Sequence, residues 1–174
     1  SCNIFCYSCA MRLGITKSDE YATAFGLGET TGVEMSESAG VLASPENREN
    51  NGGIWNAGDT LQTAIGQSDN IFTPLQLANY CSTVANGGTR YRAHFVKSVK
   101  SSDYSETILS NDGVVLNETG VSQNSIRIVK ESMEMLGARL PAFKSLPVKV
   151  AAKTGTAESK AKVSGKIVTG LNGF

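Results

Sequence analysis

The residues best suited to chemistry lie near the end of the chain, where residues 148–158 read VKVAAKTGTAE. An apolar run leads there into Lys153, Thr154, Gly155 and Thr156, an order that suits a strand at the edge of an acyl-transfer site. The lysine supplies positive potential, the threonine hydroxyls can bind a carboxylate, and the glycine leaves room for a ligand backbone. A lone Lys-Thr-Gly string is also common at exposed strand ends, so the rest of the sequence must decide.

The start of the chain supplies a second motif, because Ser1-Cys2-Asn3 places a hydroxyl and a carboxamide two residues apart. Ser-x-Asn followed about 150 residues later by Lys-Thr-Gly resembles the second and third motifs of the penicillin-binding proteins. The segments YATAFGLGETTGVEM, GDTLQTAIGQSDNIFTPLQLANYCSTVANGG and VAAKTGTAE are similar to the class B, monofunctional transpeptidases of that family. The resemblance covers nearly all of the chain.

The resemblance implies an α+β fold of the penicillin-binding transpeptidase and serine β-lactamase kind, in which an antiparallel sheet is flanked by helices. Residues 1–174 are then part of one transpeptidase domain. Residues 1–90 are expected to form mainly a helical lobe with loops, and residues 91–174 the strands and helix of a sheet lobe. The Ser-x-Asn motif is expected to face Lys-Thr-Gly across a cleft.

The resemblance also implies an activity and a set of residue roles. The complete enzyme attacks the D-Ala-D-Ala end of a peptidoglycan stem peptide and passes the acyl group to an amine, and β-lactams mimic that substrate. Ser1 relays a proton near the leaving amine, Asn3 holds the substrate amide, and Lys153 sets the positive field. Thr154 and Thr156 bind the terminal carboxylate, and the Thr156 backbone N–H is one of two oxyanion donors. No metal or cofactor is implied.

One departure from the family pattern concerns the nucleophile, which the family carries in a Ser-x-x-Lys motif upstream of Ser-x-Asn. This chain opens at Ser-x-Asn and stops at Phe174, so we interpret it as a fragment that is inactive alone. The string Ser159-Lys160-Ala161-Lys162 has the right letters but follows Lys-Thr-Gly in a stretch that predicts a turn. The chemistry needs the serine at a helix N-terminus with the lysine one turn on, so we do not expect Ser159 to be catalytic.

Composition narrows the partners and the location. With 40% hydrophobic residues, 18% charged residues and zero formal net charge, the chain has no electrostatic case for nucleic acid or an anionic membrane surface. No stretch approaches the roughly 20 apolar residues of a spanning helix. The resemblance implies the extracytoplasmic face of a bacterial membrane, an anchor N-terminal of this segment, and cell-division or elongation proteins as candidate partners.

Three cysteines form a pattern of their own, because Cys2, Cys6 and Cys9 have a spacing that some radical enzymes use for an iron–sulfur cluster. The same spacing fits one face of an amphipathic helix over residues 3–13, where cysteines are small core residues. We therefore predict a buried structural role for these three and for Cys81. A metal or reactive-thiol role is the less favoured alternative.

Capping residues and periodicity predict further helices at residues 73–85 and 122–140 and a short helix or strand at 60–65. Residues 26–59 are predicted to form an irregular segment on the surface. Residues 91–99 are predicted to form a strand, and Asn111-Asp112-Gly113 is predicted to form a hairpin turn. The Gly66-Gln67 turn lies near the active-site floor in the family. A buried glutamine that satisfies loop backbone is an equal alternative, so Gln67 is not among the predicted catalytic residues.

Three other functions remain compatible with the motifs. A serine β-lactamase or β-lactam sensor shares them, and the deacylation rate of the full-length protein separates these from a wall synthase. A catalytically inert binding or scaffold relative is distinguished by the upstream sequence. A cluster protein would hold iron.

Overall fold

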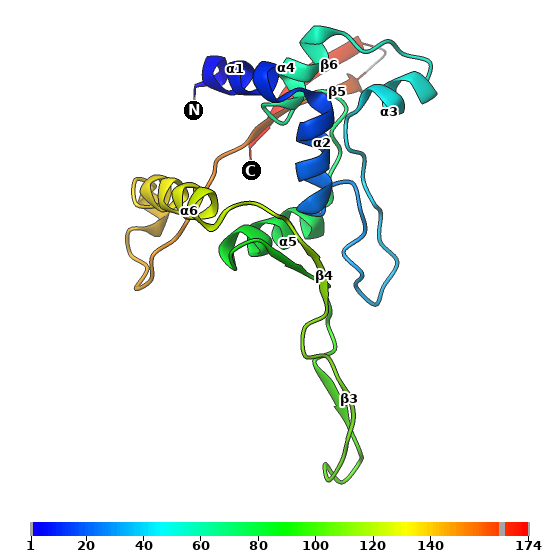
Figure 1. Ribbon diagram of the computed structural model, residues 1–174, viewed down its shortest axis with the longest axis vertical. Coiled ribbons are helices and arrows are strands. Elements are labelled where there is room, and N and C mark those ends of the chain that lie inside the picture. Colours follow the sequence, from blue (N-terminus) through cyan, green and yellow to red (C-terminus); the bar gives the residue numbers. More distant parts are fainter. Residues whose placement is uncertain (1, 164–165, 174) are drawn as a thin grey trace.

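The computed structural model describes residues 2–163 and 166–173, which form helices and narrow antiparallel ribbons (Figure 1). The predicted combination of helices and strands is confirmed. In chain order the elements are α1 (Asn3–Leu13), α2 (Ile15–Ala24), α3 (Pro45–Asn50), α4 (Ala57–Thr63), α5 (Pro74–Ala85), β1 (Thr89–Tyr91), β2 (Ser98–Lys100), β3 (Thr107–Ser110), β4 (Val115–Glu118), α6 (Gln123–Gly137), the 3₁₀ turn η1 (Pro141–Phe143), β5 (Thr156–Val163) and β6 (Lys166–Gly173).

The predicted long helices form where their capping residues stand. The Thr73 hydroxyl accepts a hydrogen bond from the Gln76 N–H at 3.1 Å, and Pro74 occupies the first turn of α5. The Ser122 hydroxyl caps α6 in the same way, at 3.1 Å from the Ser125 nitrogen. These bonds satisfy backbone donors that a helix leaves free at its start, so they fix where each helix begins.

The strands form three separate two-stranded antiparallel ribbons in the described part of the chain, namely β1 with β4, β2 with β3, and β5 with β6. The prediction of one strand over residues 91–99 was wrong, because β1 ends at Tyr91 and β2 begins at Ser98. The hairpin turn was also misplaced. Asn111-Asp112-Gly113 joins β3 to β4, which belong to different ribbons, and the actual turn is closed by Asp103, which accepts hydrogen bonds from Ser101 and Ser105.

Residues 26–59 differ from the surface excursion that the sequence predicted. They contain the helix α3, which starts where Ser44 caps it and Pro45 takes the first turn. Thr31, Val33 and Ala43 are buried. This segment is irregular but partly internal.

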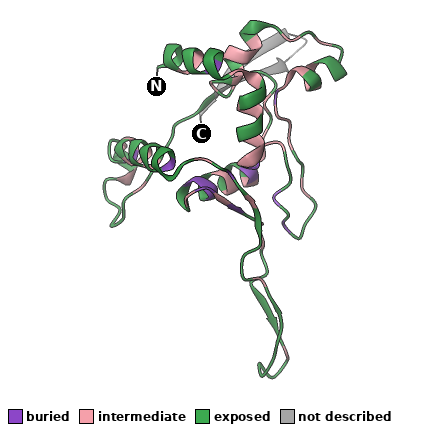
Figure 2. Cartoon of the chain, in the orientation of Figure 1, coloured by how far each residue is buried: buried purple, intermediate pink, exposed green. Residues whose placement is uncertain are grey.

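Side-chain burial is concentrated around α5, β1 and the loop before α3, whereas the β2–β3 ribbon is exposed along its length (Figure 2). The buried apolar side chains are few and belong to different elements: Ala10, Val33, Ala43, Val84 and Ile126.

The predicted burial of the cysteines is wrong. Cys2, Cys9 and Cys81 are exposed and Cys6 is half-buried, all as free thiols. For the cysteines at α1, the physical reason is that this helix packs mainly against α2 and α4, which leaves much of its surface open. Helical spacing predicts which residues share a face, but it does not say which face is covered.

No helix among the described residues has the length and apolar character needed to cross a bilayer.

Candidate active site

The Lys-Thr-Gly segment lies directly before a strand, whereas the sequence predicted that it lies on one. Lys153, Thr154 and Gly155 precede β5, and Thr156 is its first residue, paired in register with Gly173. The four residues of the segment are exposed, and the Lys153 ammonium donates to the Thr154 carbonyl at 2.6 Å. A positive charge, two hydroxyls and a side-chain-free position are therefore open to a ligand.

The Ser-x-Asn motif lies at the start of α1. Ser1 falls outside the described residues, and Asn3 is the first residue of the helix, with its side chain exposed. Within residues 2–163 no hydrogen bond joins Asn3 to Lys153. The proposed roles of Asn3, Ser1 and the Lys-Thr-Gly residues stay predictions.

The two motifs are connected through α4. This helix packs against α1, and the turn that follows it carries Gln67, whose side-chain amide donates to the Thr156 carbonyl at 2.9 Å. Gln67 was left out of the predicted site, and the structure places it against the residue that opens β5. The signal that could have found it is the Gly66-Gln67 pair, a turn signal placed directly after a short predicted helix.

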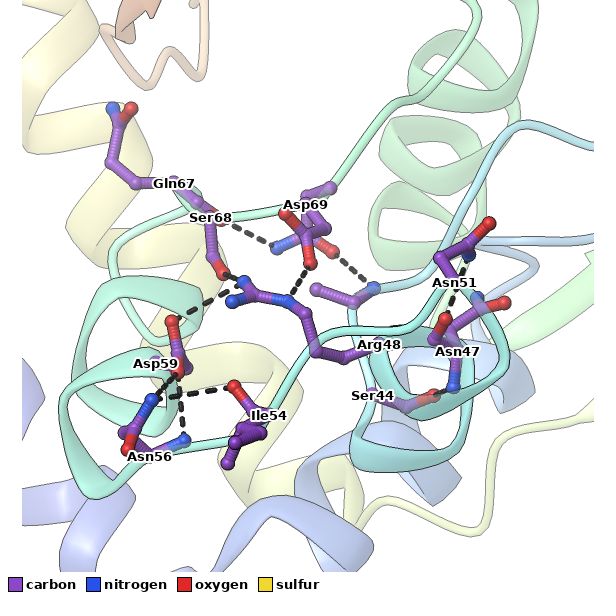
Figure 3. A network of polar contacts seen from close by, with 12 residues as sticks. Ser44, Asn47, Arg48, Asn51, Ile54, Asn56, Asp59, Gln67, Ser68 and Asp69 are labelled. Carbon is purple, nitrogen blue, oxygen red and sulfur yellow. Dashed lines mark hydrogen bonds and ion pairs between the residues drawn. The ribbon is translucent and has the colours of Figure 1, made fainter.

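A network of polar contacts centred on Arg48 binds the two residues that follow Gln67 (Figure 3). The Arg48 guanidinium donates to Asp69 at 2.5 Å, to Asp59 at 3.2 Å and to the Ser68 hydroxyl at 3.3 Å. It also lies over the Trp55 ring, 5.6 Å from the ring centroid. The hydrogen bond to Asp69 raises the pKa of Arg48 above its usual value, so this side chain remains charged.

The Ser159-Lys160-Ala161-Lys162 string lies in β5 rather than in the predicted turn. A strand does not provide the helix N-terminus that a Ser-x-x-Lys nucleophile needs, so its backbone conformation supports the noncatalytic interpretation.

Among the described residues, no three His, Cys, Asp or Glu side chains are grouped so that they could hold a metal ion. Cys2, Cys6 and Cys9 are among these described residues.

An exposed Lys-Thr-Gly segment directly before a strand is typical of the penicillin-binding transpeptidase and serine β-lactamase class. The family model described as penicillin binding protein transpeptidase domain matches residues 1–172, and the chain belongs to that family.

Two curated relatives illustrate the likeness. The chain is 29% identical to peptidoglycan D,D-transpeptidase MrdA of Acinetobacter baumannii, with 95% of the chain and 25% of the relative covered. It is 32% identical to penicillin-binding protein H of Bacillus subtilis, with 91% and 24% covered. The chain therefore spans about a quarter of the length of these curated relatives.

Solved structures show the same fold. The imipenem acyl-enzyme complex of penicillin-binding protein A from M. tuberculosis matches with a TM-score of 0.73 and 27% identity, covering 91% of this chain and 34% of that one. Penicillin-binding protein 2B of Streptococcus pneumoniae strain R6, at 22% identity, matches with a TM-score of 0.73 over 98% of this chain and 31% of that chain.

Proposed function

We propose that this chain is part of a class B peptidoglycan D,D-transpeptidase, which cross-links stem peptides through an acyl-enzyme and binds β-lactams. The observation that carries the proposal is the exposed Lys153-Thr154-Gly155-Thr156 segment at the start of β5, tied by Gln67 to the helices that carry Asn3. Membership of the transpeptidase family over residues 1–172 supports it.

In this proposal the nucleophilic serine comes from a part of the protein outside this chain. Its hydroxyl attacks the carbonyl of the penultimate D-alanine and forms an ester, while the terminal D-alanine leaves as an amine that takes up a proton. An amine of a neighbouring stem peptide then attacks the ester, which restores the serine and completes the cross-link. A β-lactam reacts at the first step because its amide is opened by the same attack.

The residues of this chain bind and polarise the substrate. Lys153 and the hydroxyls of Thr154 and Thr156 receive the terminal carboxylate, and Asn3 holds the substrate amide. The Thr156 N–H stabilises the oxyanion, and Ser1 relays the proton to the leaving amine. Gly155 lets the peptide lie beside the strand, because it has no side chain to block it.

The relatives support the β-lactam part of this proposal. Penicillin-binding protein A from M. tuberculosis has been solved as acyl-enzyme complexes with imipenem and with penicillin G. Membership of the transpeptidase family also supports the proposal that the protein acts on the extracytoplasmic side of the bacterial membrane, where peptidoglycan is assembled. Its protein partners would then belong to the wall-elongation or cell-division machinery.

Substitution of Lys153 in the full-length protein tests the function. Lys153→Ala should lower the rate of acylation by a fluorescent penicillin by about a thousandfold, because it removes the charge that faces the ligand carboxylate. Lys149→Ala is the matched control, since Lys149 is an exposed lysine on the same segment before β5. Stopped labelling followed by gel fluorescence measures both.

Retained acylation in Lys153→Ala, or an equal loss in Lys149→Ala, would contradict the proposal. Rapid release of the bound penicillin by hydrolysis would instead favour a β-lactamase, so the deacylation rate of the unsubstituted protein is measured alongside.

A further inference from the structure

The contact between Gln67 and Thr156 joins two parts of the chain that are 89 residues apart in sequence. The Gln67 side chain is half-buried, and its amide nitrogen lies 2.9 Å from the Thr156 carbonyl oxygen. A hydrogen bond of this length between distant segments restrains the position of one relative to the other.

The direction of this bond matters for the proposed oxyanion donor. In a β-strand the N–H and C=O of one residue point to the same side of the strand, as the paired bonds of antiparallel ladders require. The Thr156 N–H therefore opens on the side of β5 where Gln67 lies. Restraining the carbonyl of Thr156 also restrains the direction of its N–H.

The backbone around Gln67 is one that needs support. Ser68 has φ +68°, in the left-handed region that a residue with a Cβ rarely adopts, and Gly66 has φ +78°. The Gln67 N–H donates to the Gln62 carbonyl at 3.0 Å, and the Asn70 side chain donates to the Gln67 carbonyl at 3.2 Å. Uncommon backbone conformations of this kind persist where surrounding contacts hold them, and they are concentrated at functional sites.

Arg48 supplies part of that support from the other side of the turn. It bonds to Ser68 and Asp69, the two residues that follow Gln67, and its side chain is mostly buried with 24% exposed (Figure 3). Asp59, on α4, anchors the same guanidinium at 3.2 Å. The turn is therefore fixed at both its helical end and its loop end.

We infer that Gln67 is a positioning residue for acyl transfer, and that its amide, held by the Arg48 network, directs the Thr156 N–H toward the reacting carbonyl. The inference rests on the function proposed above and deepens it. Oxyanion donors act through being oriented before the charge develops, so a misdirected donor slows the chemical step without weakening initial binding.

The test uses Gln67→Met and Gln67→Glu in the full-length protein, with acylation by a fluorescent penicillin followed over a range of concentrations. Gln67→Met removes the donor at similar size. It should lower the first-order acylation rate about tenfold while leaving the noncovalent dissociation constant within about twofold.

Gln67→Glu gives a readout that a merely structural role would not produce. The new carboxylate cannot donate to the Thr156 carbonyl at neutral pH, but it regains a donor O–H when it is protonated. The acylation rate relative to the unsubstituted protein should therefore rise as pH falls toward 5. Gln62→Met and Gln62→Glu are the matched controls, because Gln62 is an exposed glutamine on α4.

Hydrogen exchange of the peptide that contains Thr156 provides a measurement independent of activity, and it should be faster in Gln67→Met than in Gln62→Met. Either of two results would overturn the inference. The first is an acylation rate in Gln67→Met equal to that in Gln62→Met, and the second is an equal rate of hydrogen exchange in these two variants. If the unsubstituted protein fails to acylate, the proposed function itself is wrong and this role of Gln67 falls with it. A loss of acylation rate that is confined to the Gln67 variants supports both the proposed function and this role of Gln67.

Discussion

The segment between α2 and α3 and the β2–β3 ribbon differ in a way that secondary structure alone does not reveal. Residues 26–44, here called the α2–α3 loop, form no named helix or strand, yet distant side chains hold them. The Gln76 amide donates to the carbonyls of Glu29 at 2.7 Å and Ala39 at 2.6 Å. Arg90 pairs with the Glu29 carboxylate and donates to the Thr30 carbonyl.

The distal hairpin, residues 98–110, has paired strands but few contacts with the rest of the described chain. In the described part of the chain its hydrogen bonds run within the hairpin or to Asp112 next to it. Tyr104 is 78% exposed and Ile108 is 68% exposed. Figure 1 shows this ribbon extending away from the other elements.

The comparison teaches that the position of a segment depends on side-chain donors from distant parts of the sequence, and not on regular hydrogen bonding within the segment. A glutamine amide serves this purpose twice. Gln76, 1% exposed, holds the α2–α3 loop, and Gln67 holds the start of β5. The first role is expected to appear in stability and the second in the rate of acylation.

The largest expected effect on stability comes from removing the buried glutamine. Gln76→Leu removes the partly buried hydrogen bonds to the carbonyls of Glu29 and Ala39 and to the Thr73 N–H. We expect it to lower the free energy of unfolding of the full-length protein by about 3 kcal/mol. Urea denaturation measures this, with Gln62→Leu as an exposed control that should change it by less than about 0.5 kcal/mol. Equal effects of the two variants would show that the loop is not held by Gln76.

A second substitution tests how closely that loop approaches its neighbours. Gly40 has φ +65°, and a Cβ there would lie 2.3 Å from the Ile71 carbonyl oxygen. Gly52 has φ +75° but open space around it, so Gly52→Ala carries the backbone strain alone. We expect Gly40→Ala to destabilise the protein by about 2 kcal/mol more than Gly52→Ala in the same denaturation experiment. A difference near zero would mean that the loop can move away from Ile71.

The sequence predicted the elements whose signals are local and missed those that depend on distant partners. Helix α5 was predicted because Thr73 and Pro74 are adjacent start signals and the apolar spacing follows at once. The burial of the α2–α3 loop was missed because the Gln76 amide bonds to residues 47 and 37 positions away. The spacing of residues in a polar, glycine-rich segment does not predict hydrogen-bond partners that are distant in sequence.

The candidate site likewise has parts that the sequence could predict and parts that it could not. Lys153, Thr154, Gly155 and Thr156 were predicted from residue type and order to lie on a strand, but only Thr156 belongs to β5 and the other three directly precede it. The contact of Gln67 with Thr156 could not be predicted, since it requires the turn after α4 to lie beside β5. The division of residues 1–90 and 91–174 into two lobes stays a prediction.

A smaller effect is expected from Asp19, on α2, which lines a cavity of about 340 Å³ with Thr63 and Tyr80. Burial raises the pKa of Asp19 to about 6 from an ordinary value of 3.8. The folded state therefore holds the Asp19 proton more tightly than the unfolded state does. The contribution of this protonated carboxyl to the free energy of unfolding is fully present below pH 3.8 and is lost as pH rises through about 6. Because the side chain is partly solvated, we expect Asp19→Asn to stabilise the protein by only about 1 kcal/mol at pH 7 and not at pH 3.5. Thermal unfolding across this pH range checks it, with the exposed neighbour Glu20→Gln as control. A gain that is the same at both pH values would contradict the buried-carboxyl explanation.

The smallest effect on stability is expected in the distal hairpin, where an apolar side chain buries little surface. Ile108→Ser removes a side chain that is 68% exposed, so the free energy of unfolding should change by less than about 0.5 kcal/mol. Ile126→Ser is the matched control, because Ile126 on α6 is 4% exposed and its removal should cost about 3 kcal/mol. Both are measured in urea on the full-length protein. A loss above about 1 kcal/mol for Ile108→Ser would break the comparison, since it would mean that the hairpin packs against another part of the whole protein and is held as firmly as the α2–α3 loop.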